Sequence, residues 1–140
     1  GTDCSLQQPN REETGFKMQD DLHIPSGKIH VAFAINDKLA DGTDVSWLWD
    51  VDFEKLSAVQ DKLANVFTSG IRGEDMAVRL KYAGIELPKI RLIKDYDLLI
   101  NTALSSMHES ESLYILPTYT AMLDIRKLLK KKFKLKNFWQ

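Results

Sequence analysis

The chain has 140 residues, of which 44% are hydrophobic, 9% aromatic and 28% charged, and its formal net charge is −1. This length suits one folding unit with a sizeable core, and the balanced charge excludes a strong overall attraction to nucleic acid or anionic membranes. The single cysteine, Cys4, excludes an internal disulfide framework and a multi-cysteine zinc site. Because no apolar run reaches the ~18 residues of a transmembrane segment and no signal segment opens the chain, we expect a cytoplasmic protein.

Residues 1–27 differ in composition from the rest of the chain. They are rich in Gln, Asp, Glu, Pro and Gly, and their few large apolar side chains follow neither a helical nor a strand period. Such a segment buries too little apolar surface to offset the entropy lost on ordering. We therefore expect a flexible leader at 1–27, native or added, and a folded domain at 28–140.

From Lys28 onward, strand-like and helix-like segments alternate. Residues 29–35 form an apolar β-rich run, 36–45 a polar loop, and 53–63 carry apolar groups at helical spacing. A second strand is predicted at 64–68, followed by a helix from about Glu74 that ends at Gly84, a favourable residue for a helix C-terminus.

The second half continues the alternation. A strand at 90–93 precedes a helix that Asp95 can cap and that runs to about Met107. A fourth strand is predicted at 113–116, and a last helix from about Tyr119 into the lysine-rich tail. Short connections between strand and helix predict an α/β fold of three layers, a mostly parallel sheet with helices on both faces.

In such folds, functional groups gather in the loops that follow the carboxyl ends of the strands. Here those loops are residues 36–49, 68–73, 94–96 and 117–119. The first is the most unusual, because residues 37–52 hold five aspartates together with Trp47 and Trp49. Turn formation and helix capping explain most of these aspartates, and their spacing predicts no metal site.

The other candidate features favour structural roles. The loop 68–75 lacks both glycine patterns of nucleotide-binding loops, and Glu74 and Asp75 would oppose an anion there. Arg72 could hold a carboxylate or phosphate, although a surface ion pair is favoured. His30 is expected to be packed inside a strand. The lysines of the last helix suit its dipole and a solvated face, with weak attraction to anionic lipid or RNA as the less favoured reading.

Three stretches, residues 34–54, 69–84 and 116–123, resemble the C-terminal domain of the MurT family. The first contains Asp41-Gly42-Thr43-Asp44-Val45-Ser46-Trp47-Leu48-Trp49-Asp50, an order of aspartate, serine and tryptophan that is far more specific than a glycine pattern. The resemblance covers roughly Lys28 to Leu129 and gives the leader no counterpart. It implies the Rossmann-like fold of a Mur ligase C-terminal domain.

The resemblance also implies a function. MurT is the Mur-ligase-like subunit of lipid II isoglutaminyl synthase, in which MurT and the glutaminase GatD together amidate the D-glutamate of lipid II. The position that matches the family's catalytic aspartate is Asp44, which would complete a Cys-His-Asp triad with a cysteine and a histidine from GatD. By the same analogy, Trp47 and Trp49 are candidate interface residues and Arg72 a candidate substrate-binding residue.

Cofactors and partners follow from the same resemblance. The full-length enzyme is expected to use ATP and Mg²⁺, whereas the family's ATP-binding central domain and four-cysteine zinc ribbon have no match here. We therefore expect this chain to bind no cofactor by itself, to be inactive alone, and to have no nucleic-acid partner. Two alternatives stay open: a non-catalytic docking module for the glutaminase, and an independent nucleotide-binding domain that uses residues 68–73.

Overall fold

The structure, a computed structural model, describes residues 3–6 and 27–138, with side chains for residues 27–134. A five-stranded sheet of order β1-β5-β2-β3-β4 forms its centre, and all neighbouring strands pair in parallel. The strands are β1 (Asp3–Leu6), β2 (Ile29–Ala34), β3 (Leu63–Ser69), β4 (Ile90–Leu92) and β5 (Ser112–Pro117).

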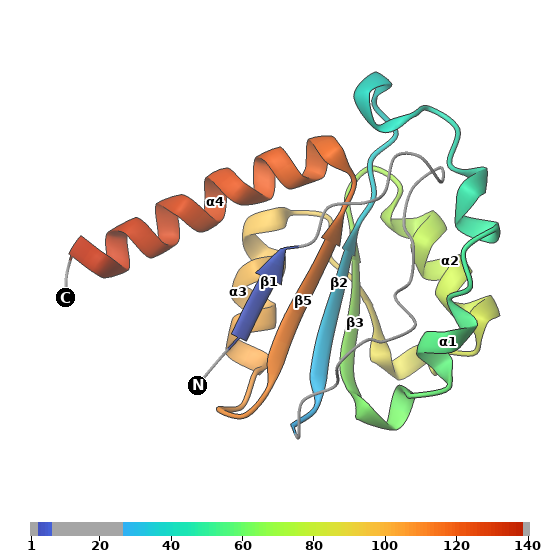
Figure 1. The fold of residues 1–140 in the computed structure, drawn as a ribbon, viewed down its shortest axis with the longest axis horizontal. Helices are drawn as coiled ribbons and strands as arrows, with labels where there is room; N and C mark the ends of the chain where they lie inside the picture. The colour runs from blue at the N-terminus through green and yellow to red at the C-terminus, as the bar shows by residue number, and fades with distance from the viewer. Residues whose placement is uncertain (1–2, 7–26, 139–140) are drawn as a thin grey trace.

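Helices cover both faces of the sheet (Figure 1). The α-helices are α1 (Glu54–Ser57), α2 (Gly73–Ala83), α3 (Tyr96–Ser106) and α4 (Tyr119–Phe138), and the 3₁₀ helices are η2 (Leu39–Asp41), η3 (Ser46–Trp49), η4 (Gln60–Lys62) and η5 (Leu87–Lys89). The predicted three-layer α/β fold is confirmed. No helix among the described residues has both the length and the apolar character to cross a bilayer.

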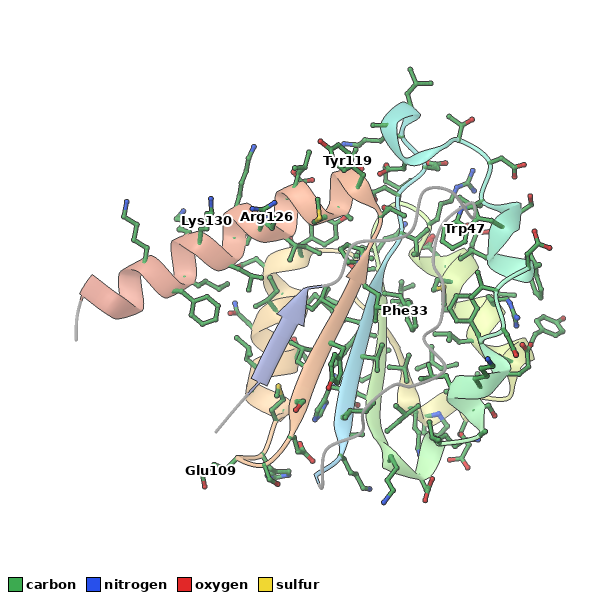
Figure 2. The ribbon with its side chains drawn as sticks, viewed as in Figure 1. Phe33, Trp47, Glu109, Tyr119, Arg126 and Lys130 are labelled. Carbon is green, nitrogen blue, oxygen red and sulfur yellow. The ribbon has the colours of Figure 1, made fainter. Side chains whose placement is uncertain are left out.

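Two apolar clusters hold the layers together. One packs β2 and β3 against η3, α1 and α2, and includes Phe33 and Trp47 (Figure 2). The other packs the opposite face of the sheet against α3 and α4, and includes Ile115 and Ile125. All six residues of β2 are buried, as expected for a central strand covered on both faces.

The predicted ends of two helices are confirmed. Gly84 follows α2 with a positive φ of 102°, a conformation that glycine adopts without steric cost. Asp95 caps α3, and its carboxylate accepts the backbone N–H of Leu98 at 2.8 Å.

The helix predicted over 53–63 is wrong. Only residues Glu54–Ser57 are α-helical, Val59 leaves the helical region with φ −117°, and Leu63 already belongs to β3, where it pairs with Ile29. Phe53, Leu56 and Leu63 still pack in the same apolar cluster. Their spacing therefore marked a common buried side rather than a continuous helix.

β1 is an element that the sequence pattern did not predict. It lies within residues 1–27, the expected leader, and extends the sheet at the edge of β5. Residues 7–26 of the expected leader lie outside the described residues.

Candidate functional site

The carboxyl ends of β2 and β5 form the centre of a polar edge of the sheet. From β2 the chain continues to β3 and β4 on one side, and β5 then pairs with the other side of β2. Ligands of open α/β sheets bind at the point where the strand order reverses in this way. The first residues beyond β2 and β5 are therefore the place to seek a site.

Asn36, which is buried, joins the ends of several strands. Its backbone N–H donates to Thr118 Oγ1 at 2.9 Å, and its side-chain Nδ2 donates to Thr120 Oγ1 at 2.9 Å. Its Oδ1 accepts the backbone N–H of Ile71 at 3.0 Å and the hydroxyl of Tyr96 at 3.2 Å. One side chain thus fixes the loops after β2, β3, β4 and β5 relative to one another.

Asp41 fastens the long loop after β2 to the first turn of α4. Its Oδ1 accepts the backbone N–H of Thr120 at 2.7 Å, and its Oδ2 accepts the Thr120 hydroxyl at 2.5 Å and the Lys38 backbone N–H at 3.2 Å. A helix N-terminus leaves its first N–H groups without intrahelical partners. Asp41 supplies such a partner from a distant loop.

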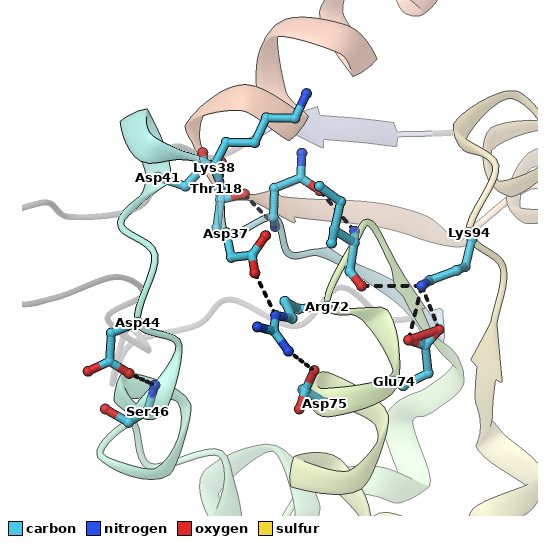
Figure 3. A network of polar contacts seen from close by, with 12 residues as sticks. Asp37, Lys38, Asp41, Asp44, Ser46, Arg72, Glu74, Asp75, Lys94 and Thr118 are labelled. Atoms are coloured by element: carbon cyan, nitrogen blue, oxygen red, sulfur yellow. Dashed lines mark hydrogen bonds and ion pairs between the residues drawn. The ribbon is translucent and has the colours of Figure 1, made fainter.

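Asp44 lies on the exposed stretch between η2 and η3 (Figure 3). Its Oδ1 accepts the backbone N–H of Ser46 at 2.9 Å. Hydrogen bonds from the Ser46 backbone and then from its side chain lower the pKa of Asp44, so the group is a carboxylate at neutral pH. The structure places this negative charge at the surface, where another molecule can reach it.

Arg79 holds the segment that follows Asp44 onto α2. Arg79 is 4% exposed, and its guanidinium donates to the carbonyl oxygens of Leu48 at 2.7 Å and Val51 at 2.8 Å. It also pairs with Glu54 at 2.9 Å, which lowers the pKa of Glu54 to about 2. The carbon of the guanidinium lies 5.2 Å from the Trp49 ring centroid.

The two tryptophans of the loop have different surroundings. Trp47 is 7% exposed and packs in the apolar cluster between the sheet and α2. Trp49 is 54% exposed, and its ring meets that of Tyr82 edge to face with centroids 5.7 Å apart. Of the two candidate interface residues, only Trp49 offers much of its ring to the surface.

Arg72 takes part in a surface ion-pair cluster (Figure 3). Its Nε donates to Asp37 at 2.7 Å, and its Nη1 lies 3.5 Å from an Asp75 oxygen. The hydrogen bond to Asp37 and the attraction of both carboxylates raise the pKa of Arg72. Among the described residues none accepts from Nη2, so both N–H groups of this nitrogen are open to a ligand.

The loop between β3 and α2 does not form a phosphate cradle. The backbone N–H of Ile71 donates to Asn36, that of Arg72 donates to the Ile35 carbonyl at 2.8 Å, and that of Gly73 donates to the Gly70 carbonyl at 3.1 Å. Glu74 and Asp75 occupy the first turn of α2. With these amides engaged and two acidic residues nearby, the geometry argues against nucleotide binding here.

A groove of about 360 Å³ opens beside this polar network. The residues lining it are Asn36, Lys38, Gly70, Ile71, Lys94, Tyr96 and Asp124. Lys94 is partly engaged, because its ammonium pairs with Glu74 at 2.7 Å and donates to the Ile71 carbonyl at 3.2 Å. Among the side chains of residues 27–134, no cluster of three or more potential metal-binding groups occurs.

His30 lies at the opposite edge of the sheet and is only 1% exposed. Its Nε2 is 2.8 Å from a Glu111 oxygen, and Asn65 Nδ2 is 3.2 Å from its Nδ1. The prediction that His30 is a packed histidine is confirmed.

Sequence reasoning missed Asn36, Arg79 and the tie between Asp41 and Thr120. For Arg79 a signal existed, because Met76, Leu80 and Ala83 define the buried side of α2 and Arg79 falls on that side. An arginine on the buried side of a helix indicates that its guanidinium forms buried hydrogen bonds. The contacts of Asn36 with the other loops and of Asp41 with Thr120 join residues 35 to 84 positions apart and have no local signal.

Comparisons with known proteins add an independent line of evidence. A family model described as MurT ligase C-terminal matches residues 15–122. Two similar relatives are MurT subunits of lipid II isoglutaminyl synthase (glutamine-hydrolyzing). The one from Streptococcus pneumoniae (strain ATCC BAA-255 / R6) is 35% identical over 95 residues, which cover 68% of this chain and 20% of the relative. The one from Staphylococcus aureus (strain COL) is 35% identical over 106 residues, which cover 76% of this chain and 23% of the relative.

Two consequences follow from these matches. The chain spans about a fifth of the length of these relatives. The family match begins at residue 15, so part of the segment before Lys28 does have a counterpart in the family, contrary to our expectation.

Proposed function

Because the chain belongs to the MurT ligase C-terminal family, we propose that it serves in a lipid II isoglutaminyl synthase and completes the active site of a GatD-like glutaminase. The two subunits together would convert the D-glutamate carboxylate of lipid II to an amide at the expense of ATP. The observation that carries the proposal is the exposed, ionised carboxylate of Asp44 on the loop after β2.

The chemistry requires such a group. In the glutaminase, a cysteine thiolate attacks the side-chain amide carbon of glutamine, and the histidine passes the thiol proton to the departing ammonia. Water then hydrolyses the thioester to glutamate. A carboxylate that accepts the second ring N–H of the histidine fixes its tautomer and stabilises its cationic form. Asp44 would act on the histidine of the other subunit in this way, as a positioning residue.

The surroundings of Asp44 support this role. One oxygen binds the Ser46 N–H, which orients the carboxylate, while the exposed position of the side chain leaves it accessible to another chain. Trp49 lies on the same loop and is 54% exposed, and aromatic side chains are favoured at the centres of interfaces. We propose Trp49 as a contact for the glutaminase.

Asp44→Asn, in the chain assembled with a GatD-like glutaminase, tests the proposal. Asparagine keeps an oxygen for the Ser46 N–H but cannot stabilise an imidazolium, so kcat for glutamine hydrolysis should fall by about two orders of magnitude or more. The KM for glutamine and subunit assembly should change little. Asp50→Asn, an exposed residue nearby, is the matched control. Unchanged kcat in Asp44→Asn would refute the assignment.

The same measurement decides the alternative of a non-catalytic docking module. That alternative draws on one observation, the bond from the Ser46 N–H to Asp44, which is typical of a turn residue. If Asp44→Asn leaves both assembly and turnover intact, docking is the better description.

Other parts of the proposal concern ATP, Mg²⁺ and the lipid substrate. Since residues 68–75 do not form a phosphate cradle, we propose that ATP and Mg²⁺ bind mainly to parts of the full-length enzyme that this chain does not span. The open Nη2 of Arg72 would meet a carboxylate or phosphate of the substrate. Arg72→Lys should then raise the KM for lipid II and leave glutamine hydrolysis unchanged.

A further inference from the structure

The outer part of α4 concentrates positive charge. From Ile125 to Gln140 the sequence has seven Lys and Arg residues and no Asp or Glu. The remaining residues hold twelve basic and twenty acidic side chains. The net charge of −1 is therefore the sum of a positively charged segment, residues 125–140, and a negatively charged remainder.

The fold places this charge on one long helix. At 1.5 Å per residue, the 20 residues of α4 span about 30 Å. Ala121 and Ile125 pack against the sheet face, and the helix then extends past the sheet, on the side where Figure 2 labels Lys130. The exposed residues of α4 within the described side chains are Leu123, Asp124, Arg126, Lys127, Lys130, Lys131, Phe133 and Lys134. We call the side formed by Leu123, Arg126, Lys127, Lys130, Lys131 and Lys134 the cationic face.

The basic groups of the cationic face are not used within the described part of the chain. There, none of its Lys or Arg side chains forms an ion pair or a side-chain hydrogen bond with another described residue. Lys132, on the side facing α3, does, since its ammonium pairs with Asp97 at 2.8 Å and donates to Asn101 at 2.9 Å. That contact anchors α4 on α3 and leaves the cationic face turned outward.

Apolar side chains accompany the charges. Leu123 is 39% exposed and Phe133 is 46% exposed. A shallow hollow of about 510 Å³ is lined by Arg126, Leu129, Lys130, Phe133 and Lys134. Cations mixed with a few exposed apolar groups suit the boundary between lipid headgroups and acyl chains.

We propose that the cationic face of α4 binds the surface of an anionic phospholipid bilayer. The charge complementarity argues for this occupant, and Leu123 and Phe133 would enter the headgroup region. Binding of α4 to the bilayer does not depend on the proposed function. The purpose of that binding, to bring the domain to a lipid-linked substrate, rests on the proposed function. α4 begins directly after Thr118, so a bilayer-bound helix keeps the polar edge within about 30 Å of the membrane.

RNA is the competing polyanion. Single-stranded RNA binding combines a basic groove with aromatic platforms on which bases stack. Leu123, which is 39% exposed on this face, can enter the headgroup region of a bilayer but offers no ring on which a base could stack, and this favours lipid.

Vesicle co-sedimentation of the full chain tests the proposal. Vesicles of phosphatidylcholine with 30 mol% phosphatidylglycerol should bind the chain, and phosphatidylcholine alone should not. Each basic residue near such a surface contributes roughly fivefold in affinity. The triple substitution Lys127→Gln, Lys130→Gln and Lys131→Gln should therefore weaken binding by about 100-fold. The control variant Lys28→Gln, Lys62→Gln and Lys81→Gln, at three exposed positions, removes the same charge and should weaken vesicle binding far less.

Two further measurements, the salt dependence of binding and the effect of replacing Phe133, complete the test. Raising the salt from 0.1 M to 1 M shortens the Debye length from about 10 Å to about 3 Å and should release the chain. Phe133→Ser should weaken vesicle binding with helicity by circular dichroism unchanged. Absence of binding to anionic vesicles, equal loss in the two triple variants, or tighter binding to a uridine 20-mer at the same salt would overturn the proposal. None of these readouts requires the glutaminase or turnover.

Discussion

Replacing Arg79 with methionine tests whether a buried guanidinium holds the loop that carries Asp44. Methionine retains most of the aliphatic volume and removes every donor. The carbonyl groups of Leu48 and Val51, which receive bonds of 2.7 and 2.8 Å, would lose their partners. Glu54 would lose its cation.

The magnitude follows from the burial of each group. Hydrogen bonds from a charged donor contribute about 1.5–3 kcal/mol each, and Arg79 is 4% exposed. The Glu54 side chain is 53% exposed, so its ion pair adds less than about 1 kcal/mol. Since water can reach the partly buried Val51 carbonyl, we expect the free energy of unfolding to fall by about 3 kcal/mol.

Urea denaturation of the full chain measures this change. Glu54→Gln isolates the ion pair and should cost less than about 1 kcal/mol, and Arg126→Met, at an exposed site on α4, should lie within about 0.5 kcal/mol of the parent. If Arg79→Met loses no more than Glu54→Gln, the carbonyl contacts do not stabilise the loop and the reasoning is refuted.

Three further predictions concern single contacts. Asp41→Ala removes the acceptor for the Thr120 N–H and should cost about 1 kcal/mol in urea denaturation, because the effect is that of losing a helix cap. Thr68→Val should raise the free energy of unfolding by about 1 kcal/mol, since Thr68 Oγ1 is buried and has no hydrogen-bond partner among the described residues; a loss would show that the hydroxyl is satisfied. The ion pair with Arg79 lowers the pKa of Glu54 from 4.5 to about 2. The Glu54 carboxylate therefore stabilises the fold above pH 4.5, and this contribution disappears as the pH falls toward 2. Glu54→Gln should remove this part of the pH dependence of the free energy of unfolding.

The layer structure of this fold could be predicted from the sequence because the buried strands have an unambiguous pattern. A run such as Ile29–Ala34 is apolar except for His30, and such a short β-rich run is typical of a strand covered on both faces. Gly84 and Asp95 marked helix ends through backbone chemistry that acts within a few residues. The position of Asp44 after the first of these strands followed from the same reasoning.

The interior of the site could not be predicted, because its contacts depend on where β5 lies. Asn36 and Thr118 meet only because β5 pairs with β2 rather than with β4. Local sequence carries no information about that order of strands. The same holds for Asp41, whose cap on α4 requires two segments 79 residues apart to meet.

The position of Asp44 between two anchors connects the fold to the proposed chemistry. On the amino-terminal side, Asp41 binds the first turn of α4; on the carboxyl-terminal side, Arg79 binds the Leu48 carbonyl. A carboxylate that orients an imidazole of another chain has to be held in place before the partner arrives, because a loosely held group loses catalytic effect. Buried or partly buried contacts therefore flank the exposed Asp44, and loosening either anchor should lower kcat for glutamine hydrolysis although neither Asp41 nor Arg79 is assigned a contact with the substrate. If the Arg79→Met variant assembles with the glutaminase and keeps full kcat at temperatures below its unfolding transition, then Asp44 does not have to be held in place by this anchor.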